Sequence, residues 1–153
     1  MTDATTPDVN ALLDEARIPM AVKAASVALA AAGLVVALLG VQNLTLVRWS
    51  GSYVFVPVAL LVFGAIGIGV AAKLVRGRAW SLPAAIATAA SLTLSAVGFF
   101  VLSAMAGLFT ALSVLSAGAA VTALVLTLIA VGPFRQLVDT RRRLREAGYD
   151  LDL

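Results

Sequence analysis

Residues 79–134, AWSLPAAIATAASLTLSAVGFFVLSAMAGLFTALSVLSAGAAVTALVLTLIAVGPF, carry no charged side chain over 56 residues. A membrane-spanning helix needs about 20 apolar residues. This stretch is therefore too long for one span and suits two spans joined by a tight turn, for which Ala106-Gly107 lies near the midpoint. We predict spans over 82–104 and 109–132, which so short a connection makes antiparallel neighbours.

Two shorter uncharged stretches precede this one. Residues 24–47 lie between Lys23 and Arg48, and residues 49–72 lie between Arg48 and Lys73. Each has room for one span, which we place at 21–41 and 54–73. The sequence therefore predicts four spans in all.

Composition favours lipid as the solvent of this chain. Of the 153 residues, 61% are hydrophobic and 12% are charged, against roughly 45–50% and about 25% in soluble domains. The mean hydropathy is +1.03. A soluble fold of this kind would expose large apolar patches and aggregate. We predict an all-α membrane protein whose single domain, residues 21–132, is a four-transmembrane-helix bundle.

Lysine and arginine predict the orientation of the bundle. With four spans, both termini and the 73–81 connection lie on one side of the membrane. That side has ten basic residues, while the other has only Arg48. Because basic residues concentrate on the cytoplasmic side, both termini are expected there, in the plasma (inner) membrane of a bacterium. The ten residues are Arg17, Lys23, Lys73, Arg76, Arg78, Arg135, Arg141, Arg142, Arg143 and Arg145.

The segments outside the bundle are predicted to be short cytoplasmic helices. In residues 1–20, the apolar Val9, Leu12, Leu13 and Ala16 share one face of a short amphipathic helix. Residues 133–153 are expected to extend the fourth span as far as Gly148, after a stop or kink at Gly132-Pro133.

A basic cluster in the C-terminal extension suggests contact with anionic lipid headgroups. The simpler alternative is that these charges only set the topology, and the sequence favours it. Nucleic-acid binding is not expected, because no aromatic platform accompanies the cluster. The residues of the cluster are Arg141, Arg142, Arg143 and Arg145.

The outer loop, residues 42–53, has two possible structures. β-prone residues flank Ser50-Gly51, which would suit a small hairpin. An extended crossing is slightly favoured, because an isolated hairpin is only marginally stable.

Small residues recur every three or four positions in all four spans, which is the repeat of a left-handed bundle. The predicted seams are Ser26, Ala30, Gly33, Ala37 and Gly40 in the first span; Gly64, Gly67 and Ala71 in the second; Ala84, Thr88, Ser91, Ser95 and Gly98 in the third; and Ser113, Ser116, Ala120, Ala123, Thr127 and Ala130 in the fourth.

The hydroxyls of the last two seams are candidates for a function. They could line a polar pathway, or they could hold the helices together while bonding to their own backbone; the second interpretation is favoured. The six residues are Thr88, Ser91, Ser95, Ser113, Ser116 and Thr127.

The residues needed for chemistry are missing from the spans. The chain has no cysteine and no histidine, which removes thiol nucleophiles and histidine-ligated metals and haem. No acidic or basic side chain lies inside a span, whereas proton and ion coupling usually depend on one. We therefore predict no enzyme activity, no cofactor and no metal.

Three hypotheses about function remain. The leading one is an accessory, assembly or stabilising subunit of a larger membrane complex, whose partner is another membrane protein. The alternative is a homo-oligomeric pore or facilitator lined by the hydroxyls of the third and fourth spans. A holin-like lytic membrane protein is the third.

Overall fold

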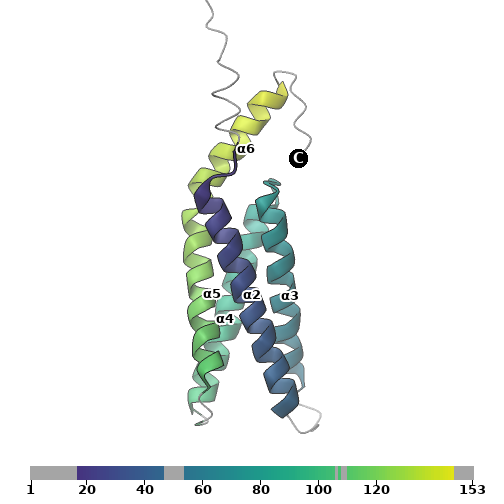
Figure 1. Ribbon diagram of the computed structural model, residues 1–153, viewed down its shortest axis with the longest axis vertical. Coiled ribbons are helices and arrows are strands. Elements are labelled where there is room, and N and C mark those ends of the chain that lie inside the picture. The colour runs from purple at the N-terminus through teal and green to yellow at the C-terminus, as the bar shows by residue number, and fades with distance from the viewer. Residues whose placement is uncertain (1–16, 47–53, 106, 108–109, 147–153) are drawn as a thin grey trace, which may run out of the picture.

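The computed structural model describes residues 17–46, 54–105, 107 and 110–146. These residues form five helices and no strand (Figure 1). The predicted N-terminal amphipathic helix and the end of the chain beyond Glu146 lie outside the described residues. The helices are α2 (Met20–Leu46), α3 (Phe55–Val75), α4 (Ser81–Met105), α5 (Ala111–Ile129) and α6 (Val131–Glu146).

Helices α2 to α5 are each long and apolar enough to cross a membrane. Even the shortest, α5 with 19 residues, is about 28 Å long at 1.5 Å per residue, close to the roughly 30 Å of a hydrocarbon core. The prediction of an all-helical membrane protein with four spans is confirmed at this level, and the helix ends lie within five residues of the predicted ones.

The four long helices alternate in direction and close into a ring (Figure 1). Helix α2 packs against α3 and α5, and α4 packs against α3 and α5 to complete the ring. Helix α2 is the most enclosed: 44% of its apolar window is buried, against 28% in each of the other three. The remaining surface of the spans is apolar and faces outward.

Helix α2 continues beyond its predicted end at residue 41. Two polar side chains that could have left the helix bond back to it instead: Asn43 Nδ2 donates to the Leu39 carbonyl at 2.8 Å, and Thr45 Oγ1 donates to the Gln42 carbonyl at 2.7 Å. Residues 44–46 are therefore helical, and a hairpin strand there is ruled out. Residues 47–53 lie outside the described part of the chain.

Glycines form two of the turns. Gly77 follows α3 with φ +67°, and its N–H donates to the Leu74 carbonyl at 3.0 Å. Gly107 lies in the predicted turn between α4 and α5, with φ +68°. This left-handed conformation is strained for a residue with a Cβ. Thr110 then caps α5 by accepting the Ser113 N–H at 3.2 Å.

Helices α5 and α6 are separated by one residue, Ala130, which is not assigned to either helix. Pro133 has no N–H, so the Ile129 carbonyl lacks its usual donor four residues on. The backbone nevertheless continues, because the Phe134 N–H donates to the Ala130 carbonyl at 2.9 Å. The result is the predicted kink at Gly132-Pro133, beyond which α6 leans over the end of the bundle (Figure 1).

Candidate functional site

The α2–α3 interface is so close that backbone meets backbone. A Cβ on Gly64 would lie 2.5 Å from the Gly33 carbonyl oxygen, and one on Gly33 would lie 2.7 Å from the Gly64 carbonyl oxygen. Beyond them, the buried Ser26 hydroxyl donates to the Ala71 carbonyl at 2.8 Å. The small-residue seams of the first two spans therefore meet each other, which leaves no passage at this crossing.

The α5 seam is also placed as the spacing indicated. All six of its residues are buried, and Ser113, Ser116 and Thr127 have no exposed surface. Their hydroxyls donate to carbonyls of the same turn or the turn before: Thr110 at 2.7 Å, Ser113 at 2.9 Å and Ala123 at 2.7 Å, respectively. These three hydroxyls are thus satisfied inside one chain.

The predicted seam of α4 is largely wrong. Only Thr88 of its five residues is buried, whereas Ser91 and Ser95 lie at the edge of the buried face and Ser91 donates to the Ala87 carbonyl at 2.9 Å. Small size alone selected that seam, but a leucine fills the contact to α3: the Leu92 side chain occupies the space left by Gly67. The buried face contains Leu82, Ala85, Thr88, Ala89, Leu92 and Ala96.

A residue outside the predicted seams joins α4 to α5. Thr93 Oγ1 lies 2.8 Å from the Ala89 carbonyl of its own helix and 3.0 Å from the Ala120 carbonyl of α5. Its position between two predicted seam residues, Ser91 and Ser95, gave no signal, because only the rotation of α4 decides which hydroxyl faces α5.

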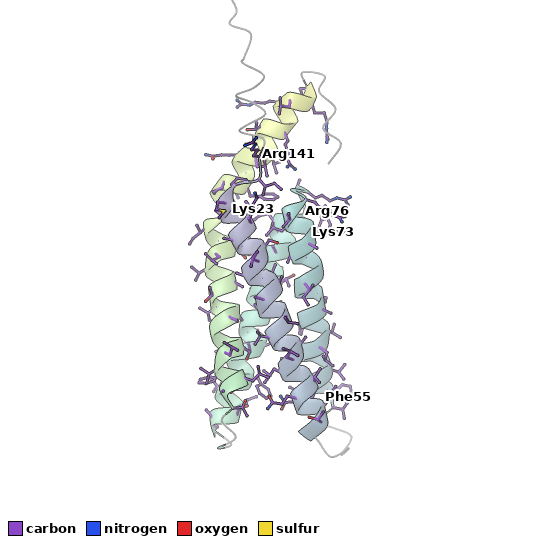
Figure 2. All side chains as sticks on the ribbon, in the orientation of Figure 1. Lys23, Phe55, Lys73, Arg76 and Arg141 are labelled. Atoms are coloured by element: carbon purple, nitrogen blue, oxygen red, sulfur yellow. The ribbon has the colours of Figure 1, made fainter. Side chains whose placement is uncertain are left out.

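Charged groups gather at the opposite end of the bundle from Phe55, as Figure 2 shows for Lys23, Lys73, Arg76 and Arg141. The alternating directions of the helices bring the start of α2, the α3–α4 turn and α6 together there. This end contains the ten basic residues that the sequence placed on one side.

A hollow of about 740 Å³ opens at this basic end, between the α3–α4 turn and α6. Five arginines line it, together with one aromatic side chain and one carboxylate, and we call it the arginine hollow. The carboxylate of Glu146 accepts from Arg142 Nε at 2.9 Å in an exposed ion pair. Its lining residues are Arg76, Gly77, Arg78, Ala79, Trp80, Val138, Arg141, Arg142, Arg145 and Glu146.

Arg141 is the most constrained side chain of the arginine hollow. Its guanidinium lies against Gly77, so closely that a Cβ at residue 77 would collide with it. Nη1 donates to the Arg76 carbonyl at 3.3 Å. Nε is buried and has no hydrogen-bond partner within the part of the chain that the structure describes. Burial also lowers the pKa of this guanidinium by desolvation, although an arginine remains charged.

The structure divides the four arginines that were predicted to contact lipid. Arg141, Arg142 and Arg145 line the arginine hollow. Arg143 instead lines a separate hollow of about 400 Å³ beside Pro19 and Pro133. Sequence reasoning used Arg76 and Arg78 only for orientation and placed Trp80 only at an interface, because nothing local shows that the turn and α6 meet.

Within the described residues, no three histidine, cysteine, aspartate or glutamate side chains come together as a metal site would require. Comparison with protein families, curated proteins and solved structures finds no match to this chain. The function must therefore be argued from its own residues.

Proposed function

We propose that this chain is a non-enzymatic accessory subunit that packs against a larger membrane complex and helps to assemble or stabilise it. The observation that carries the proposal is the contrast between the spans and their basic end. The described spans are tightly packed and chemically plain, whereas charged and polar groups are concentrated where the helices leave the apolar region.

The outward faces of the spans support a role in contact with other molecules. Large aliphatic side chains of α3, such as Val62 and Ile66, are about half exposed, at 51% and 45%. No hydrophobic effect drives helices together in lipid, so a partner would be held by close packing and by polar contacts at the membrane surface. Both kinds of surface are present on this chain.

The same packing argues against the pore. Ser113, Ser116 and Thr127 are fully buried between helices of one chain, and each hydroxyl is bonded to a carbonyl. A pore on the axis of a homo-oligomer would need such groups on the outer surface of each chain, or a rotation of α5 that breaks its present packing.

A pull-down at native expression tests the proposal. The chain would carry a small affinity tag, be extracted in a mild detergent, and be analysed with its co-purifying proteins by mass spectrometry. We expect a distinct membrane protein in constant ratio to the tagged chain. Recovery only as a monomer or as a symmetric homo-oligomer would contradict the accessory role.

We further propose that the basic end is cytoplasmic and that the protein resides in a bacterial inner membrane. Because the chain contains no cysteine, single-cysteine variants test this directly. A membrane-impermeant maleimide should label Ser52→Cys on intact cells and should label Arg145→Cys only after permeabilisation. The reverse pattern would overturn the orientation.

A further inference from the structure

We infer that the arginine hollow is a specific binding site for the phosphate headgroup of an anionic membrane lipid. This inference rests on the proposed position of the basic end at an anionic headgroup layer and requires no partner protein. It goes beyond general attraction to the membrane, because it assigns the phosphate to one hollow and to particular guanidinium groups.

Charge is the first reason. Five arginines but only one carboxylate line the hollow. That carboxylate, on Glu146, bonds to Arg142 at the exposed rim of the hollow, where the two side chains are 63% and 78% exposed. Arg76, Arg78 and Arg145 have no ion-pair partner in the described residues. A headgroup phosphate would supply the missing negative charge.

The state of Arg141 is the second reason. Most buried polar atoms in proteins have a hydrogen-bond partner, yet its Nε has none in the described residues. Its single contact, Nη1 to the Arg76 carbonyl at 3.3 Å, is long. A guanidinium has five donors in a planar fork that matches two phosphate oxygens. Burying this group without an anion costs free energy, which a phosphate would offset.

Gly77 shapes the hollow for this purpose. Its positive φ turns the chain sharply after α3, and its missing Cβ leaves the space that the Arg141 guanidinium occupies. The hollow thus depends on one contact between elements that lie 65 residues apart in the chain.

The lining also favours a lipid over a free anion. Ala79, Trp80 and Val138 add apolar surface beside the arginines, and Trp80 is 52% exposed at the start of α4. Tryptophan is favoured at the headgroup level of a bilayer. A volume of about 740 Å³ lies within the roughly 300–1,000 Å³ typical of small-molecule sites, so the phosphate and its glycerol group have room.

Trp80 provides the measurement. The full chain with Trp49→Phe keeps Trp80 as its single tryptophan. It would be placed in phosphatidylcholine nanodiscs that contain increasing fractions of phosphatidic acid. We expect a saturable change in Trp80 emission. An emission that does not respond, or that rises linearly without saturation, would overturn the inference.

Two variants separate a site from diffuse charge. Arg141→Gln and Arg143→Gln remove the same charge from the same helix, but only Arg141 lines the arginine hollow. We expect Arg141→Gln to weaken apparent lipid affinity at least about tenfold, the effect of losing charged hydrogen bonds. Arg143→Gln should weaken it by no more than about fivefold, as expected of one surface charge. Equal weakening by both would overturn the site.

Further arms protect the conclusion. If far-UV circular dichroism shows that Arg141→Gln does not fold, the exposed Arg78→Gln takes its place, with an expected loss of about fivefold or more. Inorganic phosphate in phosphatidylcholine nanodiscs tests a free anion: displacement of phosphatidic acid by it at comparable concentration would overturn the choice of lipid. Lipid binding without a co-purifying protein would contradict only the accessory role, whereas a partner without lipid binding would contradict only this inference.

Discussion

The two helix hairpins of the bundle are joined in different ways. Helices α2 and α3 touch backbone to backbone at Gly33 and Gly64. Helices α4 and α5 are linked through the Thr93 hydroxyl, at 3.0 Å from the Ala120 carbonyl. In lipid, close packing and interhelical hydrogen bonds are the two available sources of association. The comparison teaches that one small chain uses both, and that the glycine contact tolerates less change.

Replacing Gly64 by leucine should have the largest effect. Even a Cβ at this position would meet the Gly33 carbonyl oxygen at 2.5 Å and the Ala37 Cβ at 2.8 Å, so α2 and α3 must separate. We expect a loss of about 3 kcal/mol or more in the free energy of unfolding, at the upper end of the overpacking range. Reversible unfolding in SDS, followed by circular dichroism, measures it.

Gly69→Leu is the matched control for this prediction. It makes the same substitution on the same helix, but a Cβ there meets nothing within 4 Å. We expect a change within about 1 kcal/mol, comparable to the helix-propensity difference of glycine. Equal destabilisation by both variants would show that the close α2–α3 approach is not what Gly64 provides.

Ser26→Ala should have an intermediate effect. The buried hydroxyl donates to the Ala71 carbonyl across the α2–α3 interface, and alanine removes this bond with little change in volume. Interhelical hydrogen bonds in membranes contribute about 0.6 kcal/mol on average and up to about 1.7. We expect a loss of about 1 kcal/mol in the same assay. Ser91→Ala, whose hydroxyl bonds only to its own helix, should cost less; a larger cost would reverse this ranking.

Thr93→Val should have the smallest effect of the three. A single hydroxyl proton is shared between the Ala89 and Ala120 carbonyls, so only part of a hydrogen bond joins α4 to α5. We expect a loss of about 0.5 kcal/mol in the free energy of unfolding, near the average interhelical value. Thr122→Val is the control, because its exposed hydroxyl donates only to the Gly118 carbonyl of α5. Loss of more than Ser26→Ala would show that the α4–α5 link is the stronger one.

Sequence reasoning was most successful where the physical cause is local. Hydropathy over about 20 residues decides whether a segment suits lipid, so the four spans could be found from the distribution of charge alone. The turn at Gly107 and the kink before Pro133 followed from the backbone properties of those two residues. The α2 seam was likewise visible, because its glycines recur at Gly33 and Gly40.

What only the tertiary structure decided is how these segments face one another. The buried face of α4 includes Ala89 and Leu92 rather than Ser91 and Ser95, because side-chain packing against two neighbours sets the rotation of a helix. The tilt of α6 brings Arg141 onto Gly77, from opposite ends of a long stretch of chain. Spans, turns and charge bias are properties of short segments, whereas the arginine hollow exists only because distant segments meet.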